Sequence, residues 1–434
     1  MSGKLQRVEV PGREATARSK PPSNFRWLVL VLLAAGTMIN YLDRTVLGIA
    51  APGLSKDFDL SPAHMGVLLS AFSWAYVAGQ IPGGVLLDRF GNRLTYFFAV
   101  TLWSLFTVLH GFATNLYGLL SMRLGLGVSE APCFPTNARV VTVWFPQQER
   151  ARATAIYTVG EYLGLACFGP TLFWLTSHFG WRSMFVVVGA AGILFGLVWW
   201  KLYQDPRTDA AHIPLIDAVP FSWSQVRQLL RVRQIWGACL GQFGGNSTLV
   251  FFLTWFPTYL ATERHMAWIR AGWFSVLPFL AGAAGILFGG WLSDFLLRQT
   301  GSANLARKLP MIVGLLGAST IVGANYAATD NIVIAILSVA FFAQGMTGLG
   351  YAVISDIAPM NLMGLTGGMF SLAANLAGIV TPLIIGVIIA RTGSFTYALG
   401  YVGATALLGA VAYIFILGDV HRVEMQRPAR SVDP

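Results

Sequence analysis

The sequence contains GGVLLDR at residues 83–89 and GGWLSDF at residues 289–295, in the second half of the chain. Each copy follows an apolar stretch of about 20 residues, which is the length that a helix needs to cross a lipid bilayer. The first copy continues as Gly-x-x-x-Asp-Arg-x-Gly-x-Arg from Gly84 to Arg93. A motif that recurs after the second and the eighth apolar stretch predicts two equivalent halves with a site between them.

Apolar stretches of this length recur along the whole chain of 434 residues, of which 55% are hydrophobic and only 11% are charged. Soluble domains carry far more charge, so the sequence predicts an all-α integral membrane protein with twelve transmembrane helices in two six-helix bundles. The predicted spans are 26–52, 64–87, 94–113, 116–144, 150–175, 182–203, 234–260, 268–297, 308–328, 331–356, 361–390 and 396–418.

The longest polar interruption, at residues 204–232, separates the first six spans from the last six. Within it we expect a short amphipathic helix around Trp223 to Leu230. The predicted organisation is a disordered cytoplasmic tail at 1–25, an N-terminal bundle at 26–203, a cytoplasmic linker at 204–232, a C-terminal bundle at 233–418 and a cytoplasmic tail at 419–434.

The net charge of +10 follows the predicted membrane topology. If Arg26 begins the first span on the cytoplasmic side, most of the 29 Lys and Arg residues fall in cytoplasmic segments. This bias places both termini in the cytoplasm, and it accounts for the basic residues without a nucleic-acid partner.

Motifs of enzymes and pumps are missing from the sequence. It has no Gly-rich nucleotide loop, no nucleophile elbow and no paired metal ligands, and its three cysteines lie in apolar spans. We therefore expect neither an enzyme nor an ATP-driven pump, and no cofactor or metal.

Ionisable residues in the middle of the predicted spans need a partner or a function, because a charge there costs at least ~2.5–3.5 kcal/mol. All of them lie in the N-terminal half. Asp43 and Arg44 are adjacent on one helix, so they point in different directions. We expect Asp43 to pair with Arg123, and Arg44 to face the cavity and bind a carboxylate. The alternative is a purely structural lock formed by the three residues.

Two further carboxyls complete this group. Glu130 is the predicted proton carrier, because burial between helices favours the neutral form of a carboxyl until an arginine or water approaches. A carboxyl that only bonds to a neighbour is the alternative. Glu161 is a second candidate for binding a proton or substrate, with a structural hydrogen bond as its alternative.

Neutral polar side chains lie on the apolar helices of the C-terminal half and suit a hydroxylated ligand. Each of them can instead join two helices by a hydrogen bond. On the N-terminal side, Tyr41 shares a helix face with Arg44, and ordinary aromatic packing is the alternative to substrate binding there. The candidate substrate-binding residues are Arg44, Tyr41, Tyr76, Glu161, Gln242, Asn246, Ser355 and Asn375.

The signature between residues 84 and 93 resembles that of the major facilitator superfamily, and the likeness extends over residues 26–418. Within this superfamily, NYLDR at 40–44, RLGLGVSEAP at 123–132 and WFP at 144–146 are similar to the anion:cation symporter family. The bacterial members of that family carry sugar acids such as galactonate and hexuronates, and its animal relatives move sialate, glutamate and phosphate-type anions. The resemblance implies gating by Gly84, Asp88, Arg89, Gly91, Arg93 and the equivalent Asp294.

The resemblance also implies roles for the buried charges: proton coupling for Asp43 and Glu130, anion binding for Arg44 and charge balance for Arg123. It places Tyr76 towards the cavity and a polar residue at Asn375 in reach of the substrate. Glu161 departs from the family, because galactonate-type carriers are expected to have a neutral amide there. This departure leaves open which substrate is carried and how many protons accompany it.

The function expected from the sequence is symport of a small organic anion with protons by alternating access, most simply of a sugar acid. The alternatives are anion exchange, symport of an aromatic or dicarboxylic acid, and a membrane receptor that does not transport. We expect a monomer in a bacterial inner membrane, with the lipid bilayer, the anion and protons as its partners.

Overall fold

The computed structural model describes residues 25–205, 223–359 and 362–423, and these residues form helices joined by short turns. The first half contains α1 (Phe25–Asp57), α2 (Pro62–His110), α3 (Leu116–Glu130), α4 (Cys133–Trp144) and α5 (Gln147–Leu202).

The second half begins with α6 (Trp223–Leu229), at the position where the sequence predicts a short helix. The helices that follow are α7 (Arg233–Thr254), α8 (Phe256–Thr258), α9 (Trp268–Thr300), α10 (Ala303–Ser319), α11 (Asp330–Met346), α12 (Gly350–Ile357), α13 (Met363–Thr392) and α14 (Thr396–Val411). Short 3-10 or π segments, η1 (Tyr259–Glu263), η2 (Thr320–Tyr326), η3 (Thr347–Leu349) and η5 (Ala412–Ile416), extend or connect several of them.

Two of the long helices each cross the membrane twice. Gly91 in α2 and Gly180 in α5 have φ angles of 73° and 78°, a region in which glycine is favoured because it has no Cβ. The two arms of α2 lie side by side, since Thr95 Oγ1 donates to the carbonyl of Leu86 at 3.3 Å. A turn at a single glycine therefore separates the two spans in each case, whereas the predicted spans leave residues 88–93 and 176–181 between them. The twelve predicted crossings are present in two six-helix bundles.

The outer surface is apolar, as a lipid environment requires. Among the described residues, seven helices are long and apolar enough to cross a membrane. Large hydrophobic side chains such as Ile81 of α2, Trp273 of α9 and Leu408 of α14 are exposed. An apolar groove of about 620 Å³ opens between α2 and α3, and its lining contains none of the candidate site residues. The molecule therefore presents hydrocarbon-like surface on its outside and keeps its buried charges within the bundles.

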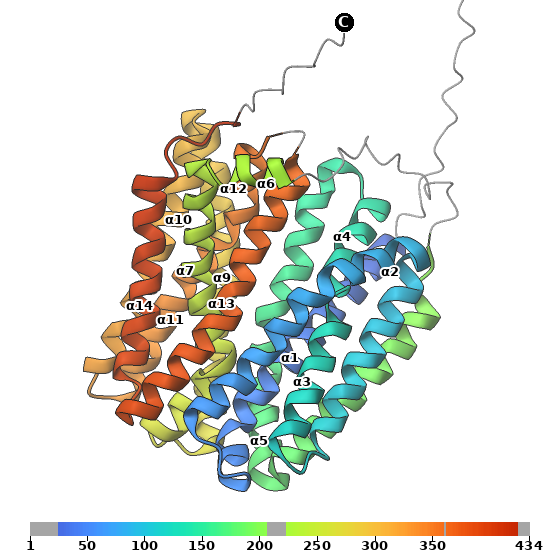
Figure 1. Cartoon of the computed structure of the whole chain (residues 1–434), viewed down its shortest axis with the longest axis vertical. Helices are drawn as coiled ribbons and strands as arrows, with labels where there is room; N and C mark the ends of the chain where they lie inside the picture. Colours follow the sequence, from blue (N-terminus) through green and yellow to red (C-terminus); the bar gives the residue numbers. More distant parts are fainter. Residues whose placement is uncertain (1–24, 206–222, 360–361, 424–434) are drawn as a thin grey trace, which may run out of the picture.

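Figure 1 shows the N-terminal bundle in blue to green beside the C-terminal bundle in yellow-green to red. We call the side on which α1 begins and η5 ends the terminal side, and the other the opposite side. Contact between the bundles runs along α1 with α7 and α8, α2 with α13, and α5 with α9.

Close approaches between the bundles occur at glycines near the opposite side. A Cβ on Gly48 of α1 would lie 2.5 Å from the carbonyl oxygen of Thr254, and one on Gly66 of α2 would lie 2.7 Å from that of Pro382. A Cβ on Gly272 of α9 would lie 2.9 Å from that of Phe173. Small residues let helix backbones approach closely in membranes, so the bundles are closed against each other on the opposite side.

Parts of the predicted domain organisation fall outside the described residues. These are the N-terminal tail up to residue 24, most of the linker at 206–222 and the C-terminal tail from residue 424. The predicted domain boundaries in these segments remain predictions.

Candidate functional site

Arg44 and Glu130 form an ion pair between α1 and α3. Arg44 Nε donates to Oε1 of Glu130 at 2.6 Å, and Arg44 Nη2 contacts the same oxygen. The side chain of Glu130 is completely buried, whereas that of Arg44 keeps 16% of its surface exposed. The guanidinium is thus the member of the pair that a ligand can reach.

Four aromatic rings surround the guanidinium of Arg44. Its central carbon lies 4.9 Å from the ring centroid of Tyr41, 4.8 Å from Phe72, 5.0 Å from Tyr76 and 5.9 Å from Phe134. Aromatic faces attract cations, most strongly where water is excluded. The rings therefore hold the guanidinium in place while leaving its hydrogen-bond donors to carboxylates.

The structure thus brings Tyr41 and Tyr76 together at Arg44, as the sequence analysis expected. Phe72 and Phe134 were not predicted. Phe72 precedes Tyr76 by one helical turn and stacks on it, with centroids 5.4 Å apart, so the i, i+4 spacing was the available signal.

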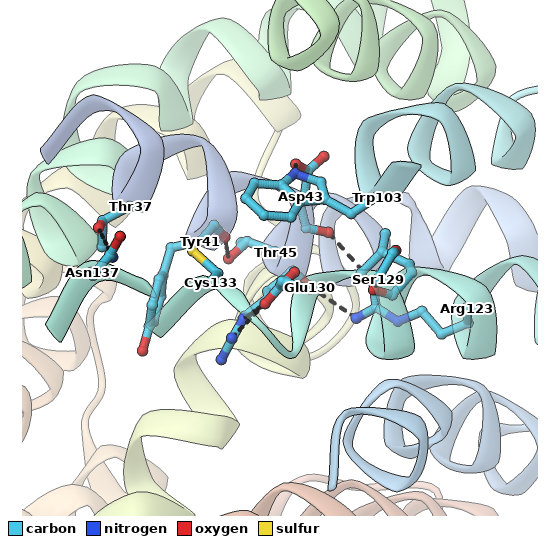
Figure 2. A network of polar contacts seen from close by, with 12 residues as sticks. Thr37, Tyr41, Asp43, Thr45, Trp103, Arg123, Ser129, Glu130, Cys133 and Asn137 are labelled. Carbon is cyan, nitrogen blue, oxygen red and sulfur yellow. Dashed lines mark hydrogen bonds and ion pairs between the residues drawn. The ribbon is translucent and has the colours of Figure 1, made fainter. Parts of the chain in front are cut away.

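Asp43 points away from Arg44 and is held by α2. Trp103 Nε1 donates to Asp43 Oδ2 at 2.9 Å, and Thr107 Oγ1 donates to Oδ1 at 2.8 Å. Asp43 is only 1% exposed, so these two donors replace water around a buried carboxyl. Figure 2 shows Asp43 against Trp103, with Glu130 on the other side of α1.

The predicted ion pair between the carboxylate of Asp43 and Arg123 is wrong. Arg123 instead donates to main-chain carbonyls, with Nη1 3.4 Å from the oxygen of Asp43 and Nη2 3.2 Å from the oxygen of Arg44. The carboxylate of Asp43 faces α2, so only the backbone of α1 is in reach of the guanidinium. Arg123 therefore fixes the segment of α1 that carries both candidate residues, Asp43 and Arg44.

Glu161 lies on α5 where this helix meets α1. It is 8% exposed and interacts with Tyr41 and Arg44. The next residue, Tyr162, reaches the other bundle, where its hydroxyl donates to Oε1 of Gln344 at 3.3 Å. Glu161 is therefore a second carboxyl near Arg44.

The polar residues of the C-terminal bundle form a separate group. Gln242 Nε2 donates to Oδ1 of Asn246 at 3.4 Å, and Asn246 Nδ2 donates to the carbonyl of Ala374 at 3.0 Å. Asn375 Nδ2 donates to the carbonyl of Ser371 at 2.8 Å. These amides come together on α7 and α13, and each is partly exposed.

Ser355 does not join this group. It is exposed near the end of α12, where its hydroxyl donates to the carbonyl of Tyr351 and its own carbonyl accepts from Arg422. The helix continues for two residues only, so Ser355 lies at the terminal side, apart from Arg44.

The signature segment forms contacts within the N-terminal bundle. Asp88 pairs with Arg139 of α4 at 3.1 Å, and Gly91 makes the turn between the arms of α2. Arg93 Nε donates to the carbonyl of Trp200 at 3.2 Å. Arg89 lies over the ring of Phe90 at 5.4 Å, and a Cβ on Gly84 would meet open space. The segment thus ties α2 to α4 and α5.

The second copy of the signature makes a different contact. Asp294 is exposed, and its neighbour Ser293 accepts a hydrogen bond of 2.9 Å from Arg307, which also pairs with Asp356 at 2.9 Å. The repeat therefore preserves its position in the fold, but within the described part of the chain Asp294 has no ion pair like that of Asp88 with Arg139.

A sequence profile described as Major Facilitator Superfamily matches residues 33–305. The chain belongs to the Major Facilitator Superfamily. It is therefore a membrane transporter and not an enzyme.

Two relatives show the likeness over nearly full length. The chain is 40% identical to the probable galactarate/D-glucarate transporter GudP of Escherichia coli strain K12, over 95% of this chain and 98% of that protein. It is 42% identical to the D-galactonate transporter of E. coli O6:H1, over 93% and 98%. This facilitator thus has relatives named for both a monocarboxylic and a dicarboxylic sugar acid.

Solved structures confirm the facilitator fold. The inward-open xylose transporter XylE of E. coli matches with a TM-score of 0.72 at 14% identity, covering 91% of this chain and 97% of that one. An inward-facing bacterial homologue of the human lysosomal transporter Spinster matches with a TM-score of 0.69 at 22% identity, covering 92% and 96%.

Proposed function

We propose that this facilitator couples the uptake of a sugar acid to protons in a bacterial inner membrane. The observation that carries this proposal is the ion pair between Arg44 and Glu130. One guanidinium has two candidate partners, the buried carboxylate of Glu130 and the carboxylate of a ligand. Protonation of Glu130 weakens its hold on Arg44 and frees the guanidinium for the ligand.

This competition couples the two binding events in both directions. A proton on Glu130 favours anion binding, and by linkage a bound anion favours a proton on Glu130. The loaded site then has an anion on Arg44 and a neutral carboxyl beside it. This arrangement buries less net charge than the anion with an ionised Glu130, so we expect the loaded carrier to change conformation readily.

Asp43 and Arg123 support this exchange from behind α1. Arg123 fixes the carbonyls of Asp43 and Arg44, and Asp43 balances the charge of Arg123. Asp43 is a second proposed proton site, because it is a carboxyl that is only 1% exposed and that directly precedes Arg44 in α1.

The amides of the C-terminal bundle complete the proposed site. Gln242, Asn246 and Asn375 are neutral and partly exposed, and they suit the hydroxyl groups of a sugar acid. The relatives named for galactarate, glucarate and galactonate support this substrate class.

The contacts between the bundles support transport by alternating access. They are closed at Gly48 and Gly66 on the opposite side. We propose that the terminal side faces the cytoplasm, in agreement with the distribution of basic residues. Rocking of the two bundles about Arg44 would then expose the site to either side in turn. One chain contributes every residue of the proposed site, so we propose that it works as a monomer.

The test is uptake into proteoliposomes with and without an acidic exterior. The compounds are galactonate, gluconate, glucuronate, galacturonate, glucarate, tartrate and 4-hydroxybenzoate. We expect the proton gradient to drive accumulation of a sugar acid, and the Arg44→Ala variant to abolish it. Equal uptake with and without the gradient would support exchange or facilitated diffusion. Uptake of 4-hydroxybenzoate alone would contradict the substrate class.

A further inference from the structure

The region around Arg44 has more carboxylates than cations that can bind a ligand. Three carboxyls, those of Asp43, Glu130 and Glu161, lie close to two guanidiniums. The guanidinium of Arg123 is occupied by two backbone carbonyls and is only 2% exposed. Arg44 therefore remains as the cation that can take a ligand carboxylate.

Among the described residues, the wall that the C-terminal bundle presents to this site has no second cation. Its described polar groups there are amides and hydroxyls: Gln242, Asn246, Gln344, Ser371 and Asn375. The described basic residues of this bundle lie near the ends of its helices, as in the pair of Arg307 with Asp356. A second carboxylate on a ligand would therefore meet neutral groups on one wall and carboxyls on the other.

Glu161 is the carboxyl that such a ligand would meet. Glu130 is completely buried behind Arg44, whereas Glu161 interacts with Tyr41 and Arg44 and retains 8% exposure. The next residue on α5, Tyr162, bonds across the interface between the bundles to Gln344. Repulsion between like charges extends over several ångströms in a water-poor site, so it acts on a six-carbon ligand in any pose that places one carboxylate on Arg44.

We infer that Glu161 makes this site selective for sugar acids with a single carboxylate, and that it rejects dicarboxylic sugar acids. A terminal hydroxyl can donate a hydrogen bond to Glu161, whereas a terminal carboxylate would oppose it. Rejection by an unfavourable charge is a common source of specificity. The inference rests on the proposed function, and it selects between the two substrate classes for which the relatives are named.

Galactonate and galactarate provide a direct test, because they share the same hydroxyl configuration and differ only at C6. Binding of each is measured by titration calorimetry with the purified full-length protein, at about pH 8, where galactarate is a dianion. The wild type is compared with Glu161→Gln, which removes the charge, and Glu161→Asp, which keeps it. Glu149→Gln is the matched control, since Glu149 is a carboxyl on the same helix that pairs with Arg26 at the terminal side.

We expect the wild type to bind galactonate at least about tenfold more tightly than galactarate. Glu161→Gln should reduce this ratio roughly tenfold through a gain in galactarate binding. Glu161→Asp and Glu149→Gln should keep the wild-type ratio. The inference is overturned if the wild type binds galactarate as tightly as galactonate. It is also overturned if Glu161→Gln binds galactonate and its preference for galactonate over galactarate equals that of the wild type.

These outcomes differ from a failure of the proposed function. Tight binding of both acids, with uptake that requires Arg44, would leave sugar-acid transport intact and remove only the selectivity. Binding of neither acid would remove the proposed function and the inference with it. If Glu161→Gln does not fold, the wild-type ratio and the Glu161→Asp variant still decide the inference.

Discussion

Arg44 Nε lies 2.6 Å from Oε1 of Glu130, and this carboxylate is completely buried while its partner is not. The unequal exposure gives the two residues different tasks. Glu130 can exchange a proton but cannot meet a large ligand, and Arg44 can meet a ligand but does not lose its own proton. In the proposed mechanism, this single contact connects the proton to the anion.

Removing only one member of this pair should destabilise the protein. Arg44→Ala leaves an uncompensated buried carboxylate, and we expect a loss of about 3–5 kcal/mol in the free energy of unfolding. The double variant with Glu130→Gln should recover much of this loss, because the remaining group is neutral. Unfolding monitored in detergent, with anion binding measured in parallel, checks both points. Binding should stay absent in the double variant.

Replacing Glu130 alone should separate exchange from accumulation. Glu130→Gln keeps the shape of the side chain and leaves Arg44 free, so anion exchange between equal pools should continue. Accumulation driven by a proton gradient should fall at least about tenfold, because the titrating group is lost. Counterflow and gradient-driven uptake in the same proteoliposomes measure the two activities. Equal loss of both would indicate a general structural defect.

The donors of Asp43 should contribute to stability. Thr107→Val removes a hydroxyl that lies 2.8 Å from the buried carboxylate, and we expect a loss of about 1–3 kcal/mol in the free energy of unfolding. Thr142→Val is the matched control, because the Thr142 hydroxyl donates to the carbonyl of Ala138 in its own helix and the residue is partly exposed. This substitution should change stability by less than about 0.5 kcal/mol. Similar losses in both variants would argue against a special role for Thr107.

Closure on the opposite side should depend on Gly48. The added Cβ in Gly48→Val would lie 2.5 Å from the carbonyl oxygen of Thr254, so this closed arrangement becomes less favourable. We expect a shift of the population towards the conformation open on the opposite side. A cysteine at position 73, where Ser73 contacts Gly378 between the bundles, should then react faster with an impermeant thiol reagent.

Gly400→Val provides the control for that substitution, because a Cβ at Gly400 meets no atom within 4 Å. Its labelling rate at position 73 should match that of the parent protein. Unchanged labelling in Gly48→Val would show that this contact does not control access.

The architecture followed from the sequence because the length of each apolar stretch and the repeat at 83–89 and 289–295 are local features. The tight turns at Gly91 and Gly180 could not be predicted from the sequence. Their positive φ angles depend on the geometry of two neighbouring helices and not on composition. The α1 and α3 members of the site could be listed from their charge. The sequence could not predict which of these residues pair. The pairing depends on the rotation of α1 about its axis, which directs Asp43 to Trp103 and Arg44 to Glu130.

The central claim is that a proton and the anion are bound together through Arg44 and Glu130. The most direct test is to mix galactonate with the purified protein in weakly buffered solution near neutral pH and to follow a pH indicator. The account predicts that the protein takes up close to one proton for each anion bound, and that Glu130→Gln binds the anion with much less proton uptake. Binding of galactonate to the wild type without any proton uptake would contradict it.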